Sequence, residues 1–180
     1  MLAVGLSLVA ALGFGSSAIF ARVGMQGIKP LPSTLIAAVA TFPPVLLLTL
    51  MFAWPDTRAV PAVGFLWLLC LGGLNYLGGR ALNYLSIDLL GASRSSPFVG
   101  TSAVFAAIFA VTLTGEQPHP VVILGTALVF LGLGMATGGS MGQGWHIDRR
   151  SLLGYLSALG AGASYGGTNV VAKALTAMYG

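Results

Sequence analysis

The sequence contains few charged residues. Only 7% of its 180 residues are Asp, Glu, Lys or Arg, and 56% are hydrophobic. Soluble domains carry about 25% charged residues, so this composition excludes a water-soluble globular protein and indicates a polytopic membrane protein. The eight basic residues form no cluster larger than Arg149-Arg150, which argues against a nucleic-acid-binding surface.

Cysteine and histidine are also scarce. Cys70 is the single cysteine and lies in an apolar run, so the sequence forms no internal disulfide and leaves the redox compartment open. His119 and His146 lie in predicted loops without partners at metal-ligand spacing, so we predict no metal site and no bound cofactor. Both histidines lie outside the apolar runs and no HExxH motif occurs. An intramembrane enzyme is therefore the least favoured function, and we predict that the protein is not an enzyme.

Long apolar runs predict an all-α fold with six transmembrane helices. A span needs about 20 apolar residues. The first run lacks the charged start and the cleavage site of a signal peptide, and Pro43-Pro44 predict a kink in the second. A short turn, Leu85–Asp88, makes the third and fourth spans antiparallel neighbours. The predicted spans are 2–21, 33–54, 65–84, 90–113, 121–137 and 152–171.

The first and sixth spans resemble each other. A shift of 151 residues places Phe14 on Tyr165 and Arg22 on Lys173, with glycine and small polar residues between them in register. We therefore predict one five-helix repeat over 1–137, a glycine-rich loop over 138–151, and the start of a second repeat over 152–180. Because five is odd, the second repeat is inverted in the membrane, as in many secondary transporters. Ten helices are expected in all, with four more spans after Gly180.

Two segments resemble a known family, the EamA branch of the drug/metabolite transporter superfamily. FGSSAIFARVG (14–24) is similar to its first helix. Residues 91–135, from GASRSSPFVG to LGLGM, are similar to its fourth and fifth helices. The resemblance implies ten helices in two inverted repeats and transport of amino acids, nucleobases or drug-like compounds across the cytoplasmic membrane. The first span contains no acid, whereas the small multidrug pumps of the superfamily keep an essential acid there. Proton coupling by that route is not predicted.

Polar residues recur at helical spacing along the third span and its extension. Tyr76, Arg80, Tyr84 and Asp88 follow one another every four residues, which places them on one face. A charge inside the bilayer costs about 3 kcal/mol or more, so such residues face protein or a wet cavity. The phenols and the guanidinium suit a zwitterionic or anionic metabolite. The alternative is an internal Arg80–Asp88 pair with the tyrosines at the membrane interface.

Other polar residues have two interpretations each. Arg94, beside Ser96, faces the cavity or extends to the lipid headgroups. Ser17 and Asn169 bind substrate or pack helices together. Gly162 and Gly166, and Gly134 and Gly138, form small-residue packing faces, and Glu116 is a helix-terminal surface charge. The predicted substrate path comprises Tyr76, Arg80, Tyr84, Arg94, Ser96, Ser17 and Asn169.

These observations favour a secondary transporter that works by alternating access. Its predicted partners are the lipid bilayer, a small-molecule substrate, and the remaining helices of a second repeat or a second copy of the chain. A non-transporting membrane scaffold is the main alternative. The family resemblance places the N-terminus in the cytoplasm, whereas loop charges (Lys29, Arg149 and Arg150 against Arg58) place it outside.

Overall fold

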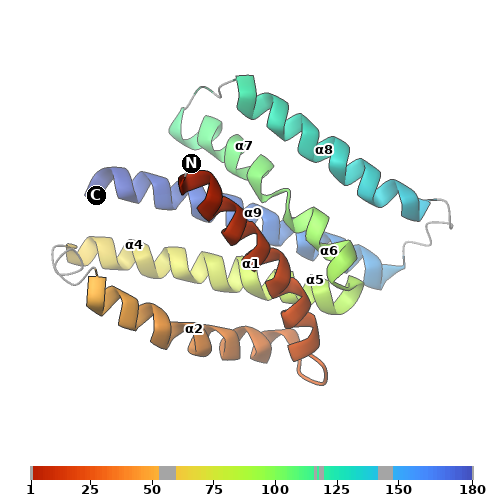
Figure 1. Ribbon diagram of the computed structural model, residues 1–180, viewed down its shortest axis with the longest axis horizontal. Coiled ribbons are helices and arrows are strands. Elements are labelled where there is room, and N and C mark those ends of the chain that lie inside the picture. The colour runs from red at the N-terminus through yellow and green to blue at the C-terminus, as the bar shows by residue number, and fades with distance from the viewer. Residues whose placement is uncertain (1, 53–59, 116, 118–119, 142–147, 180) are drawn as a thin grey trace.

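The computed structural model describes residues 2–52, 60–115, 117, 120–141 and 148–179, and Figure 1 shows their arrangement. All regular structure in these ranges is helical, which confirms the all-α prediction. Glu116, His119 and His146 lie outside the described residues. The elements are α1 (Leu2–Gly24), α2 (Pro30–Phe52), α4 (Ala62–Gly73), the π-helix η1 (Leu74–Ala81), α5 (Leu82–Leu90), α6 (Ala92–Val99), α7 (Ser102–Thr114), α8 (Pro120–Met141) and α9 (Arg149–Tyr179).

Three stretches of the described chain are long and apolar enough to cross a bilayer: Pro30–Phe52, Ala62–Leu90 and Ala92–Thr114. Two shorter apolar helices are Leu8–Gly24 and Pro120–Gly132. Large apolar side chains on α1, α2 and α8 are exposed, such as Phe20 at 74% and Leu131 at 64%. Soluble proteins rarely expose so much apolar surface, so these faces fit a lipid environment. The count of six spans stays a prediction.

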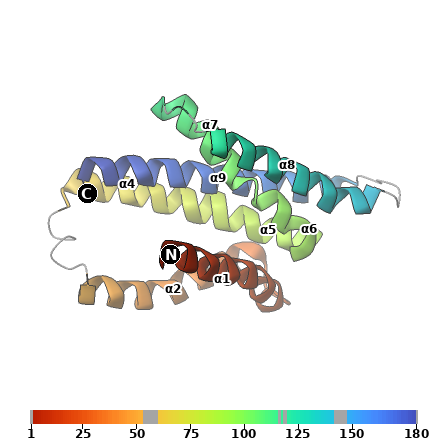
Figure 2. The ribbon, with the colours of Figure 1, turned by 45° about the horizontal axis from the view of Figure 1, so that its top comes forward.

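The helices form three layers around α9. Figures 1 and 2 show α9 beside the continuous α4–η1–α5 rod, with α1 and α2 on one side and α7 and α8 on the other. Helix α9 contacts α4, η1, α5, α6 and α7. Because α9 packs against protein, it needs fewer apolar residues than a lipid-facing helix. This explains why a helix of 31 residues, predicted as the sixth span, is not among the three apolar stretches.

Small residues let α9 approach its neighbours closely. Ala158 and Ala161 are fully buried and form the core with Val99. A Cβ on Gly162 would lie 3.0 Å from Thr101 Oγ1, and one on Gly166 would lie 2.7 Å from the backbone nitrogen of Ala106. The predicted packing face of Gly162 and Gly166 is confirmed.

The predicted turn over Leu85–Asp88 is wrong. Helix α5 continues to Leu90, and the chain reverses at Gly91, whose φ is +86°. The Ser86 and Ser95 hydroxyls are fully buried and lie 2.5 Å apart, so one donates a hydrogen bond to the other and both have a partner inside the protein. The fourth predicted span is also not one regular helix, because α6 ends at Val99 and α7 begins at Ser102. Helix α2 continues through Pro43 and Pro44.

The described parts of the 138–151 segment are mostly helical, whereas the sequence predicted a loop over the whole segment. Helix α8 extends to Met141, and α9 begins at Arg149. The Ser151 backbone N–H donates to Asp148 Oδ1 at 2.8 Å, which caps the start of α9. Hydrogen bonds from the Ser151 side chain and backbone lower the pKa of the Asp148 carboxyl.

Gly91→Ala is expected to destabilise the protein by about 1–3 kcal/mol, because the φ and ψ of Gly91 (86° and 157°) are accessible essentially to glycine alone. A Cβ there would also overlap the Arg22 guanidinium. Thermal unfolding in detergent measures the effect. Gly125→Ala on α8 is the matched control, since nothing lies within 4 Å of its Cβ position. Equal melting temperatures for the two variants would contradict this account of the turn.

Candidate functional site

The π-helix η1 lies in the middle of the longest apolar stretch. π-Helices are rare and occur often at functional sites. Gly78 and Gly79 face α9, where a Cβ on Gly78 would lie 2.5 Å from Ser164 Oγ and one on Gly79 would overlap the Tyr165 ring. These two glycines therefore let η1 and α9 touch. The contact brings Arg80, at the end of η1, close to Tyr165.

A polar cluster surrounds Arg80. The Arg80 Cζ atom lies 5.1 Å from the centre of the Tyr76 ring, as in a cation–π contact. Side-chain hydrogen bonds join Tyr165 to Arg80 and to Asn83. The Tyr76 hydroxyl lies 3.4 Å from Thr41 Oγ1 on α2. We call Thr41, Tyr76, Arg80, Asn83 and Tyr165 the Arg80 cluster; it joins α2, η1, α5 and α9.

The four residues predicted to share one face of the third span and its extension do not share one environment. Tyr76, Arg80 and Tyr84 are half-buried, whereas Asp88 is exposed. The described contacts of Arg80 are with Tyr76 and Tyr165, and among the described residues none joins it to Asp88.

Asp88 instead lines a polar cavity of about 270 Å³ with Arg22 and Gln26. Arg22 donates from Nη1 to the Ile87 carbonyl at 3.4 Å. A cation at this position stabilises the C-terminal end of α5, where the helix dipole is negative.

A larger cavity adjoins Tyr84. Its volume is about 380 Å³, and it lies between α1, α2 and α5, with Ser17, Met25 and Ser33 among its lining residues. We call it the α1–α2 cavity. Its size suits a small metabolite, since ligand pockets are commonly about 300–1,000 Å³. The structure therefore brings two predicted path residues, Ser17 and Tyr84, to one cavity.

Arg94, Ser96 and Asn169 lie elsewhere. All three are exposed, on α6 or α9. The Ser96 hydroxyl donates to the Ala92 carbonyl at 2.8 Å, within its own helix. The contacts described for the Arg80 cluster do not include them, so their place in a substrate path stays a prediction.

The predicted substrate path did not include Asn83 or Tyr165. The repeat comparison offered a signal for Tyr165, because it aligned this residue with Phe14. The two rings lie edge to face, with centres 6.3 Å apart. In the predicted two-repeat arrangement, this contact between aligned positions would lie at the junction of the repeats, where a substrate site is expected.

A comparison with protein families decides between a transporter and other membrane proteins. The model of the EamA-like transporter family matches residues 1–138. The chain belongs to the EamA-like transporter family. No curated protein and no solved structure matches the chain. As an EamA-like transporter with long apolar helices, the chain is a multi-pass membrane protein of a family of transporters rather than enzymes.

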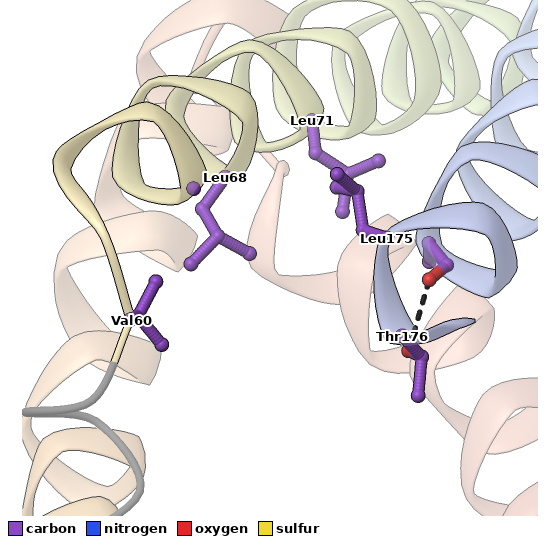
Figure 3. A pocket seen from close by; sticks show the side chains of 7 residues that line it. Val60, Leu68, Leu71, Leu175 and Thr176 are labelled. Atoms are coloured by element: carbon purple, nitrogen blue, oxygen red, sulfur yellow. Dashed lines mark hydrogen bonds between the residues drawn. The ribbon is translucent and has the colours of Figure 1, made fainter. Parts of the chain in front are cut away.

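Not every cavity of this EamA-like transporter suits a polar substrate. Figure 3 shows a cavity of about 270 Å³ between α4 and α9, lined by Val60, Leu68, Leu71 and Leu175. Thr176 is also in its wall, but its hydroxyl donates to the Ala172 carbonyl at 2.9 Å. This cavity offers few polar groups for orienting a ligand. In the α1–α2 cavity the Ser17 and Ser33 hydroxyls likewise donate to the nearby Phe14 and Lys29 carbonyls, so its case as a candidate depends on Tyr84 and on the neighbouring Arg80 cluster.

Gly79→Ala is expected to reduce transport at least tenfold while the protein still inserts into the membrane. The added methyl group would displace the Tyr165 ring and separate its hydroxyl from Arg80 and Asn83. Uptake into proteoliposomes measures the effect. Gly73→Ala is the control, because nothing lies within 4 Å of its Cβ position. Full uptake by Gly79→Ala would show that the position of Tyr165 is unimportant.

Proposed function

We propose that the protein is a secondary transporter that moves a small metabolite across the cytoplasmic membrane by alternating access. In this proposal residues 1–137 form one repeat, and the chain from residue 152 begins an inverted second repeat. The remaining helices of that repeat, or a second copy of the chain, complete the bundle. The substrate site consists of the Arg80 cluster and the α1–α2 cavity, with Arg94, Ser96 and Asn169 further along the path.

The observation that carries this proposal is the depth of the Arg80 cluster. The continuous stretch Ala62–Leu90 has 29 residues and is therefore about 44 Å long. Arg80 lies about 15 Å from its Leu90 end. If the stretch is centred on a hydrocarbon layer about 30 Å thick, Arg80 is about 8 Å below the edge of that layer. A guanidinium at that depth marks a substrate or ion path by default.

The composition of the cluster supports a site between repeats. Thr41, Tyr76, Arg80 and Asn83 come from helices before the 138–151 segment, and Tyr165 comes from α9 after it. Tyr165 also contacts the ring of Phe14, the residue with which the repeat comparison aligned it. Relative movement of the two parts would therefore open and close the site, as alternating access requires.

The proposal is tested by reconstituting the full chain into liposomes and measuring counterflow of labelled amino acids, nucleobases and organic acids. We expect at least one class to exchange above the level of protein-free liposomes. Exchange of none of them in either direction would contradict the proposal and favour the scaffold alternative.

A further inference from the structure

Arg80 has a positive charge that the described cluster does not neutralise. The chain has four acidic residues: Asp56, Asp88, Glu116 and Asp148. Asp88 is exposed and lies eight residues from Arg80, about 12 Å along the helix. Asp148 is exposed at the start of α9. Asp56 and Glu116 lie in sequence between the predicted spans. The sequence thus places no acid beside Arg80 at its depth in the membrane.

The contacts that Arg80 makes are neutral. The Tyr76 ring face and the Tyr165 hydroxyl stabilise the guanidinium, but neither carries a negative charge. A guanidinium has five N–H donors in a planar fork, and these two contacts leave donors for a pair of oxygen atoms. A carboxylate would fill that fork and remove the uncompensated charge.

The other polar groups of the cluster suit the same ligand. The Tyr76 and Tyr165 hydroxyls and the Asn83 amide are hydrogen-bond donors, the kind of group that a carboxylate oxygen accepts from. A cationic ligand would be repelled by Arg80 and would find no acid in the cluster. The ammonium group of a zwitterion would likewise lack a charged partner.

The adjoining cavity indicates what the carboxylate is attached to. Tyr84 follows Arg80 by four residues, about 6 Å along the helix, and lines the α1–α2 cavity with apolar neighbours such as Phe20, Met25 and Ile36. Arg80 does not itself line the cavity, so a ligand with its carboxylate at Arg80 would have to extend along the helix to Tyr84 to place an apolar body there.

We infer that the Arg80 cluster is an anion site that selects small organic carboxylates with an apolar body over cations and zwitterions. That these carboxylates are transported rests on the proposed function, but the charge preference of the site does not require transport. It can therefore be tested separately.

The test compares two thiol reagents of opposite charge, sulfonatoethyl and trimethylammonioethyl methanethiosulfonate. They are applied to the full chain carrying Tyr84→Cys with Cys70→Ser, which removes the single native cysteine. The measured quantity is the ratio of the anionic to the cationic reaction rate. Replacing Arg80 by glutamine is expected to lower this ratio about tenfold or more. A positive charge a few ångströms from position 84 attracts the anionic reagent and repels the cationic one, and the substitution removes that charge. Arg80→Lys keeps the charge and is expected to keep the ratio. Arg149→Gln, an exposed change at the start of α9, is expected to leave the ratio unchanged.

An unchanged ratio in Arg80→Gln would overturn the inference, and so would a cysteine at position 84 that neither reagent reaches. If Arg80→Gln does not fold, the ratio at position 84 is compared with that of free cysteine, and a value no higher overturns the inference. If the ratio behaves as expected but reconstituted protein carries nothing, the anion site stands and the transport proposal falls. If the protein exchanges cations and anions equally and the ratio is unchanged, transport stands and the anion site falls.

Discussion

Transport by Arg80→Ala is expected to fall to the level of protein-free liposomes, while expression and membrane insertion stay normal. The substitution removes the charge that faces Tyr76 and Tyr165, and it removes the planar donor group that fits an oxyanion. Removing such a charged hydrogen-bonding partner from a desolvated site commonly costs 2–5 kcal/mol, or about 30-fold to several thousand-fold in binding.

Arg80→Lys separates the two contributions. Lysine keeps the positive charge but lacks the bidentate fork, so we expect partial transport with weaker substrate affinity. Uptake rates over a range of substrate concentrations give both values. Normal uptake by Arg80→Ala would show that the guanidinium is structural or interfacial.

Gly166→Ala is expected to disrupt the packing of α9 against α7. A Cβ at this position would lie 2.7 Å from the backbone nitrogen of Ala106 and 2.8 Å from the Ser102 carbonyl oxygen. Backbone atoms cannot move aside as a side chain can, so the two helices must separate. The cost is about 3 kcal/mol or more, at the upper end of overpacking substitutions.

The neighbouring glycine provides the control. A Cβ on Gly167 would lie 3.6 Å from the nearest atom of the Phe109 ring, which is an ordinary contact. Because alanine also favours helix over glycine, Gly167→Ala is expected to be neutral or slightly stabilising. Thermal unfolding in detergent measures both variants. Similar melting temperatures would contradict the close approach of α7 and α9.

The sequence predicted the features that depend on composition and spacing. Low charge and long apolar runs indicated membrane helices, and four-residue spacing placed Tyr76 and Arg80 next to each other. The Gly162–Gly166 spacing predicted close packing of the sixth span. The family resemblance, based on 14–24 and 91–135, agrees with the family model that matches 1–138.

Features that depend on contacts between distant residues were not predictable. The π-helix forms where Gly78 and Gly79 meet Ser164 and Tyr165, and no local pattern specifies that contact. Ser86 fell within the predicted turn over Leu85–Asp88, and its partner, Ser95, becomes apparent only in the folded chain. Tyr165 was not assigned to the site for the same reason. It reaches Arg80 through helix packing across 85 positions of sequence.

The central claim is that the polar face of η1 and α5 borders a water-accessible path inside the bundle. Cysteine accessibility tests it most directly, with Tyr84→Cys compared with Leu77→Cys in the Cys70→Ser background. Tyr84 lines the α1–α2 cavity, whereas Leu77 is 66% exposed on the outside of the same rod, where lipid is expected. We predict that a membrane-impermeant maleimide labels position 84 and not position 77. Labelling of position 77 alone, or of neither position, would contradict the account.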